Sequence, residues 1–208
     1  MRRRFRPVIY GLYRWCMIGP DDDTRATLLD AARTLLEADG PAALTVRRIA
    51  AEAGMSTMNV YSRFGGKDGV VDELYCEGFH RLRAYVAKHS KSDNPVDNFR
   101  APGIGYRDFA LENRTFYSVM FFRPIPGYIP SATARRVALD GFDELVARID
   151  ELMVAGELAK TDPYNVAASH WATCHGHVGL EISRVGPADI DWESTFLGSL
   201  DALRLSLC

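Results

Sequence analysis

The stretch LTVRRIAAEAGMSTMNVYSRFGGKD, residues 44–68, decides the fold of the N-terminal part of this chain. Thr45 and Ser56 each stand where the N-cap of a helix is expected. Gly54 lies between the two helical runs, where a sharp turn favours a positive φ. The stretch predicts two short helices joined by a tight turn, the helix-turn-helix pattern. Apolar residues at helical spacing form its buried face: Leu44, Val46, Ile49, Ala50, Ala53, Met55, Val60, Tyr61 and Phe64.

The second of these helices, roughly residues 56–63, carries polar side chains away from its apolar face: Thr57, Asn59, Ser62 and Arg63. Side chains of these types can reach phosphates and base edges in a major groove. Charge is also divided along the chain. Residues 1–91 carry 15 Lys/Arg against 11 Asp/Glu, whereas residues 92–208 carry 10 against 16. The basic N-terminal part therefore suits a polyanion, and the acidic remainder does not.

Composition excludes several classes of protein. The chain has 208 residues, enough to bury a core without disulfides, and its four scattered cysteines form no C-x-x-C pair. We therefore expect a reducing, cytoplasmic location. No apolar run approaches the ~20 residues of a membrane span, so no membrane partner is expected. The catalytic motifs G-x-S-x-G and H-E-x-x-H and a Gly-rich phosphate loop are missing, which predicts neither an enzyme nor a cofactor.

Helical periodicity continues through the rest of the chain, which predicts an all-α fold of about nine helices. Pro102 falls inside the predicted helix over residues 95–113 and predicts either a kink or a split into two pieces. We expect a basic and disordered extension over 1–20, a helix-turn-helix domain over 21–68, and a helical regulatory and dimerisation domain over 69–208. The extension is interpreted as a tail, with a DNA-contacting arm as the alternative.

The segment TVRRIAAEAGMSTMNVYSRFGGKDGVVDEL, residues 45–74, resembles the DNA-binding module of the TetR family of transcriptional repressors. The shared pattern is a Thr that opens helix 2, the motif IA..AG, a Ser-capped helix 3, Tyr-x-x-Phe, and a Lys that opens helix 4. These positions are Thr45, Ile49-Ala50, Ala53-Gly54, Ser56, Tyr61, Phe64 and Lys67. The departures from the pattern are Met58, Val60, Arg63 and Gly65-Gly66. Those at Met58 and Arg63 leave the operator sequence open.

The resemblance implies a role for each DNA-facing residue. Helix 3 would lie in the major groove of double-stranded operator DNA while helix 2 crosses the backbone. Thr45 and Arg47 would meet phosphates, as would the Tyr61 hydroxyl and Lys67 at the start of helix 4. Four residues would approach bases or the adjacent backbone: Thr57, Met58, Asn59 and Arg63.

A second motif, HWATCHGHVGLEI at residues 170–182, contains Trp171, His175 and Gly176 as W-x-x-x-H-G. It resembles the signature of one C-terminal domain class of the same family, the W-HG class, which implies a small-molecule effector. The residues alone leave open whether the aromatic body is solid or encloses a pocket; the resemblance favours a pocket. The expected ligand-binding residues are Phe79, Tyr106, Phe109, Phe116, Tyr117, Met120, Phe121, Phe142, Trp171 and His175.

Two further features of the same helix carry alternatives. Ala168, Gly176 and Gly179 make one side small, which fits either packing within the chain or a four-helix interface in a homodimer. Paired half-sites in an operator favour the homodimer. The alternative function is a small-molecule enzyme or a metal or redox sensor that uses the cluster His170, Cys174, His175 and His177. No metal site is expected, because His175 stands off the face that the other three share.

We therefore expect a TetR-type regulator, a dimeric repressor that a small and largely apolar ligand releases from palindromic DNA.

Overall fold

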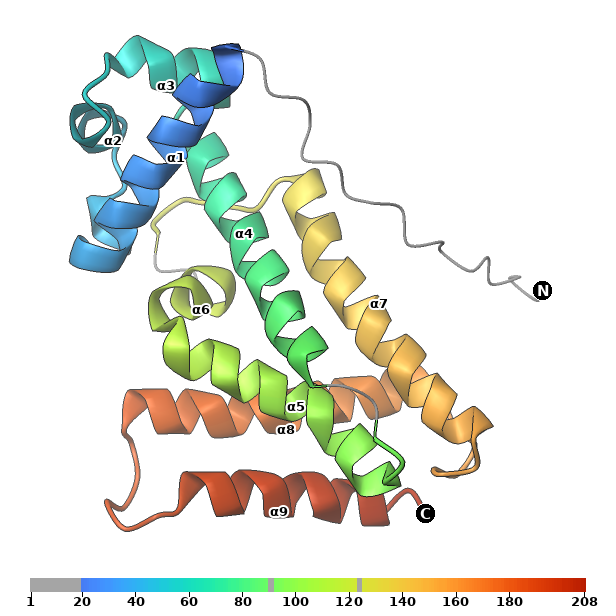
Figure 1. Cartoon of the computed structure of the whole chain (residues 1–208). Helices are drawn as coiled ribbons and strands as arrows, with labels where there is room; N and C mark the ends of the chain where they lie inside the picture. Colours follow the sequence, from blue (N-terminus) through green and yellow to red (C-terminus); the bar gives the residue numbers. More distant parts are fainter. Residues whose placement is uncertain (1–19, 90–91, 123–124) are drawn as a thin grey trace.

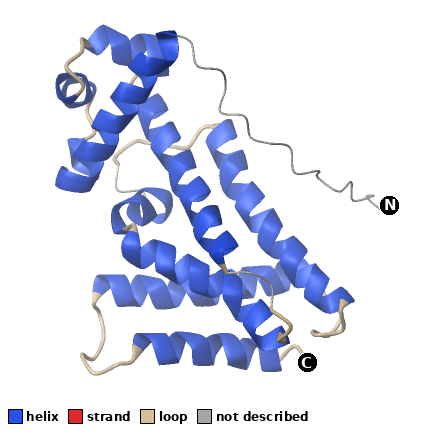
Figure 2. Ribbon diagram, in the orientation of Figure 1, coloured by secondary structure: helices blue, strands red, loops and turns tan. Residues whose placement is uncertain are grey.

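The computed structural model of the chain describes residues 20–89, 92–122 and 125–208. The predicted extension over residues 1–20 lies outside the described residues, apart from Pro20, which begins the first helix. Within these ranges all regular secondary structure is helical, and no strand occurs (Figure 2). The predicted all-α fold is confirmed, with nine α-helices and one short 3₁₀ helix in the described ranges.

The helices predicted over roughly 56–63 and over 95–113 are present as α3 and α5. In chain order the elements are α1 (Pro20–Asp39), η1 (Pro41–Ala43), α2 (Val46–Glu52), α3 (Thr57–Phe64), α4 (Lys67–Lys88), α5 (Pro95–Glu112), α6 (Arg114–Phe121), α7 (Ala132–Val154), α8 (Pro163–Ser183) and α9 (Trp192–Leu205).

One long helix connects the two ends of the molecule. Helices α1, α2 and α3 form one end, and α8 and α9 lie side by side at the other (Figure 1). Helix α4 begins beside α3 and runs into the body, where it packs along α5, α6 and α7. No helix in the described ranges is both long and apolar enough to cross a membrane.

The helix-turn-helix is built by local interactions that the sequence predicts, with one exception. The Thr45 side chain accepts a hydrogen bond from the backbone N–H of Arg48 at 3.2 Å, as an N-cap does. Gly54 turns the chain at a φ of 64°, which confirms the predicted left-handed conformation. Ser56 occupies the N-cap of α3, but its side chain forms no capping bond with the backbone. Its hydroxyl instead accepts a hydrogen bond from the side-chain amide of Asn59 at 3.4 Å.

Helix α5 is continuous through Pro102 rather than split into two helices. It is the central helix of the body, in contact with α4, α6, α7, α8 and α9. Gly105 permits the approach of α4, since a Cβ there would lie 2.6 Å from the Cα of Val86. The small residues around Pro102 therefore set how closely neighbouring helices pack on α5.

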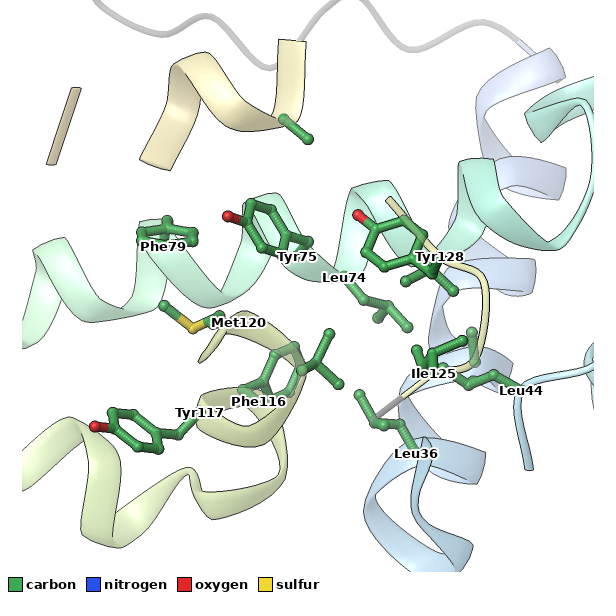
Figure 3. Packing of buried hydrophobic residues seen from close by; sticks show 14 of the residues in the cluster. Leu36, Leu44, Leu74, Tyr75, Phe79, Phe116, Tyr117, Met120, Ile125 and Tyr128 are labelled. Carbon is green, nitrogen blue, oxygen red and sulfur yellow. The ribbon is translucent and has the colours of Figure 1, made fainter. Parts of the chain in front are cut away.

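One hydrophobic cluster runs without a break from the helix-turn-helix into the body. Figure 3 shows Leu36 and Leu44 beside Ile125, with Leu74 of α4 and Phe116 of α6 close by. A second cluster lies between α5, α7 and α8 around Phe99 and Ile149. The continuous core means that the DNA-binding end and the body are packed together and are not joined by a loose linker.

Candidate nucleic-acid interface and internal cavity

Several of the predicted DNA-facing side chains on and beside helices α2 and α3 are exposed to solvent. Thr45, Arg47 and Thr57 are exposed. Met58 is 69% exposed and Tyr61 is 54% exposed, although both are large and apolar in part. Buried Val60 holds α3 to the core from its opposite side. The predicted DNA-facing residues of α2 and most of those of α3 thus share one exposed surface.

Arg63 is placed differently from the other predicted DNA-facing residues. It is half-buried and lines a hollow that also includes Arg25 of α1 and Asp72 and Glu73 of α4. Its backbone carbonyl accepts a hydrogen bond from Nη1 of Arg25 at 2.9 Å. The structure therefore brings Arg63 to the junction between α1, α3 and α4 instead of the outer face of α3.

The junction between α3 and α4 is tight. A Cβ on Gly69, in the first turn of α4, would lie 1.9 Å from the carbonyl oxygen of Phe64, the last residue of α3. Only a glycine permits this approach, so the first turn of α4 packs directly against the end of α3. Lys67 begins α4, with its Nζ 3.7 Å from a carboxylate oxygen of Asp68. Its cation therefore lies at a helix N-terminus that faces the same end of the molecule as α3.

Between α4, α5, α6, α7 and α8 the body contains a cavity of about 770 Å³ that is partly open to solvent. Six of the predicted ligand-binding residues line it: Phe79, Tyr106, Met120, Phe121, Phe142 and Trp171. The other four do not. Phe109 is fully buried against the ring of Tyr85, and Phe116 lies under the guanidinium of Arg81. Tyr117 and His175 lie behind the wall. These four rings fill space between helices, which the 3.6-residue periodicity could not distinguish from lining a cavity.

A hydrogen-bonded network joins the cavity wall to the W-HG motif. The Tyr117 hydroxyl lies 2.6 Å from Nδ1 of His175, and the Tyr106 hydroxyl lies 2.9 Å from the same nitrogen. Trp171 Nε1 donates to the Tyr106 hydroxyl at 3.4 Å. Burial raises the pKa of Tyr106 and lowers that of His175, so both groups are neutral near pH 7. The network therefore presents the Tyr106 hydroxyl and the Trp171 ring to the cavity and fixes both in place.

Charged side chains of α4 and α7 also line the cavity. Arg83 forms an ion pair with Glu144, and its Nε donates to Oε2 of that carboxylate at 3.0 Å. Arg148 is half-buried, and its Nη2 is buried with no hydrogen-bond partner among the described residues. Burial lowers the pKa of the Arg148 guanidinium, against a smaller opposing effect of the Glu151 carboxylate. The wall therefore contains a cation that the surrounding chain solvates poorly.

The histidines of α8 do not converge on one point. Nε2 of His170 donates to the Phe99 carbonyl at 3.0 Å, whereas Nε2 of His177 lies 2.9 Å from the Ser199 hydroxyl. Among the described residues no group of three or more His, Cys, Asp or Glu could hold a metal ion. Burial raises the pKa of Cys76 to about 11 and that of Cys174 to about 12, which keeps both thiols protonated near pH 7. The metal and redox alternatives therefore find no support in this geometry.

Comparison with known proteins decides the family. Residues 28–74 match the profile described as "Bacterial regulatory proteins, tetR family". Residues 99–203, half of the chain, match "Tetracyclin repressor-like, C-terminal domain". The chain belongs to the TetR family of transcriptional regulators. This TetR-family regulator is accordingly not an enzyme, which confirms that prediction, and its family binds DNA and effectors.

Curated relatives of this TetR-family chain include HTH-type transcriptional regulators from Mycobacterium tuberculosis and Mycobacterium bovis. They are 27% identical over 159 residues, which cover 71% of this chain and 66% of the relatives. The chain thus spans just under two thirds of the length of these relatives.

Solved structures share the fold. A protein with unknown function from Rhodococcus sp. RHA1 matches with a TM-score of 0.78 and 24% identity, over 94% of this chain and 98% of that one. The TetR-family regulator PfmR from Thermus thermophilus matches with a TM-score of 0.62 and 18% identity, over 86% and 97%. At these identities the likeness concerns the fold alone.

On α4 and α7, sequence reasoning found only one residue each, Phe79 and Phe142, that lines the cavity of this TetR-family regulator. Tyr75, Arg83, Gly141 and Arg148 line it and were not predicted. A usable signal was present on α7, where Gly141, Leu145 and Arg148 repeat at helical spacing and place a cation on the apolar face.

Proposed function

We propose that this TetR-family regulator is a cytoplasmic repressor that binds palindromic operator DNA as a homodimer. A small and largely apolar effector enters the cavity and releases the DNA. The observation that carries this proposal is the double role of α4. Its first turn abuts the end of α3 at Gly69, and its later turns, from Tyr75 to Ala87, form one wall of the cavity.

On the DNA side, the proposal assigns a contact to each predicted DNA-facing residue; Asn59 and Lys67 among them are half-buried. Arg47 and Thr45 meet phosphates, which position the protein without reading sequence. Thr57 and Asn59 approach base edges, and Met58 meets the methyl group of a thymine. Tyr61 and Lys67 bind phosphates on either side of the groove. Arg63, which lies at the α1–α3–α4 junction, is proposed to contact the backbone only.

Coupling between effector and DNA is proposed to pass through the start of α4. Asp72 accepts hydrogen bonds from the Tyr128 hydroxyl at 2.7 Å and from the backbone N–H of Ser131 at 3.1 Å, which ties the segment before α7 to α4. The Tyr128 ring lies 6.5 Å from that of Tyr75, which lines the cavity (Figure 3). An effector that prefers a different separation of α4 and α7 shifts the population away from the DNA-binding arrangement.

The homodimer is proposed to form through α8 and α9. A Cβ on Gly176, Gly179 or Gly198 would meet no described atom within 4 Å, so these small faces are uncovered. Leu180 and Leu205 on the same two helices are 48% and 64% exposed. A two-fold axis would pack this surface against its copy as a four-helix interface. In the W-HG class that we propose for this chain, Trp171 then faces the cavity while Gly176 faces the partner.

The experiment that tests this function is binding to the DNA flanking the gene of this protein, measured by gel shift across a salt series. Tight, saturable and salt-dependent binding that outcompetes random DNA is expected. Arg47→Ala and Lys67→Ala should weaken binding to all sequences, whereas Lys160→Ala, which removes an equal charge beyond α7, should not. Binding no tighter than to random DNA, repeated in a selection from random sequences, would overturn the proposal.

Trp171→Ala and His175→Ala separate the two halves of the mechanism. Each should alter the response to effectors and leave operator affinity close to that of the wild type, provided that circular dichroism shows an intact fold. A parallel loss of operator affinity in well-folded variants would show that the cavity wall and the DNA-binding surface are not separable.

A further inference from the structure

Arg148 is a cavity-lining cation that the described part of the chain leaves without a hydrogen-bond or ion-pair partner. The other lining cation, Arg83, is paired with Glu144 across the rim between α4 and α7. The Nη2 of Arg148 is shielded from solvent and has no acceptor among the described residues. A buried donor without an acceptor costs free energy, more so when the group is charged.

The walls around this cation are apolar and long. Lining positions run from Tyr75 to Ala87 on α4 and from Ala138 to Glu151 on α7. At the rise of an α-helix these spans are roughly 18 and 20 Å long. Arg148 lies near the C-terminal end of α7, and the aromatic rings of Tyr75 and Phe79 lie on the middle turns of α4. The cavity therefore has a cationic part and an extended apolar part.

We infer that the cavity binds a single-chain amphiphile with an anionic head, a carboxylate of the fatty-acid class. The head pairs with the Arg148 guanidinium, and the tail lies along α4 toward Tyr75. This inference rests on the proposed function, because it takes the cavity as the effector site.

The chemistry of the guanidinium selects this head group. A carboxylate accepts two parallel N–H bonds from an arginine, and such charge-assisted pairs are stronger than neutral ones. A neutral head would compensate the charge of the guanidinium poorly, and a cationic head would repel it. Both carboxylate oxygens of Glu144 accept from Arg83, and neither accepts from Arg148 in the described structure.

The arrangement also explains how tail length can matter. Tyr75 borders the far end of the apolar part and lies beside Tyr128, whose hydroxyl donates to Asp72. A tail anchored at Arg148 and long enough to reach Tyr75 would press on the connection between α4 and the segment before α7. A shorter tail would bind without reaching it.

The test uses three probes that share a ten-carbon chain: decanoate, 1-decanol and decyltrimethylammonium. Their binding to the full chain is measured by isothermal titration calorimetry without DNA and below the micelle concentration. We expect decanoate to bind at least about tenfold more tightly than decanol, because one charge-assisted pair contributes this much or more. Decyltrimethylammonium should bind more weakly than either.

Variants locate the head and the tail. Arg148→Gln should lower decanoate affinity at least about tenfold and leave decanol affinity unchanged, while Arg148→Lys should keep most of the preference for the anion. Lys160→Gln, an equal charge change outside the cavity, is the matched control. Gly141→Leu should weaken both probes, since a side chain at Gly141 meets no described neighbour within 4 Å and enters the cavity.

Equal affinity for decanoate and decanol, or an unchanged decanoate affinity in a folded Arg148→Gln variant, would overturn the inference. If decanol binding is lost in Gly141→Leu but no anion preference exists, only the head-group inference fails. If decanoate binds through Arg148 but never releases operator DNA, the inference stands and the proposed repressor mechanism fails. If no probe binds, the cavity is not a site for amphiphiles.

Discussion

The α2–α3 surface and the cavity of the body differ in how their side chains lack contacts within the protein. On α3 the side chains of Met58 and Tyr61 are exposed to solvent, and the described residues leave them uncovered. In the body, aromatic rings that are mostly buried or half-buried surround a hollow that Arg148 also lines, and the Nη2 of Arg148 is buried with no described acceptor. The first surface suits a large, charged partner that approaches from outside, and the second suits a small partner that must be enclosed.

This difference teaches that one helix can serve two kinds of recognition if its two ends are packed differently. The N-terminal turn of α4 is held rigidly to α3 by the close approach at Gly69. Its later turns face a cavity, where the packing is incomplete and the wall can adjust. In the proposed mechanism, an effector in the cavity alters DNA binding through a rigid-body movement of α4.

The largest effect on stability and operator affinity is expected from a substitution at the junction between α3 and α4. Gly69→Ala places a methyl group 1.9 Å from the Phe64 carbonyl, so α3 or α4 must shift. We expect the free energy of unfolding to fall by about 3 kcal/mol and operator affinity to fall with it. Gly141→Ala is the matched control, since its methyl group meets no described neighbour. Urea unfolding and operator binding of both variants check this; equal behaviour of the two glycines would contradict the tight junction.

Mild acid is expected to lower the stability of the body and not that of the DNA-binding end, because all five histidines lie between residues 80 and 177. Burial lowers the pKa of His170 to about 4 from an ordinary value near 6.5. Between these two pH values the unfolded chain therefore binds more protons than the folded chain. The contribution of His170 to the free energy of unfolding is fully present above about pH 6.5 and is lost as the pH falls toward 4. The loss is on the order of 3 kcal/mol at most for His170.

His170→Gln keeps a side-chain N–H donor for the Phe99 carbonyl but cannot titrate in this range. Urea unfolding at about pH 7.5, 5.5 and 4.5 should show a weaker pH dependence in this variant than in the wild type. Burial lowers the pKa of His175 and His177 too, so part of the dependence should remain. Identical pH profiles would rule out His170 as a source of the acid sensitivity.

The role of the α2–α3 surface is tested at Asn59, a residue that we propose to contact base edges. Asn59→Ala should reduce affinity for the cognate operator by about 1 to 3 kcal/mol and leave affinity for random DNA nearly unchanged. In the free protein its amide donates to the Ser56 hydroxyl at 3.4 Å, a long bond, so little stability should be lost. Fluorescence anisotropy with both DNAs measures the ratio. A uniform loss for both would assign Asn59 to the phosphate backbone.

The smallest effect concerns stability at the cavity. Arg148→Met replaces a poorly solvated cation with an apolar side chain of similar length, and should raise the free energy of unfolding of the unliganded protein by about 1 kcal/mol. The same variant should bind decanoate more weakly. Thermal unfolding without decanoate measures the gain in stability, and thermal unfolding with decanoate measures the loss of binding. A destabilised variant would mean that Arg148 has a structural partner and is not held for a ligand.

The amino-acid sequence by itself determined the all-α fold, the helix-turn-helix and its turn. These depend on interactions within a few residues, such as the Thr45 cap and the positive φ of Gly54. Thr57 could be placed on the exposed face because the periodicity of one helix fixes which side is buried. The same periodicity was wrong for Tyr61, which it assigned to the buried face although the side chain is 54% exposed. Ser56 shows the limit even there, since its hydroxyl bonds to Asn59 instead of capping the backbone.

Only the tertiary structure decided which aromatic rings line the cavity and which fill the core. Phe109 and Phe121 lie on apolar helix faces alike, yet the first is buried against Tyr85 and the second borders the hollow. The displaced position of Arg63 and the buried Nη2 of Arg148 likewise depend on helices distant in sequence. A cavity is the space that several helices fail to fill together, and no single helix contains the information that determines it.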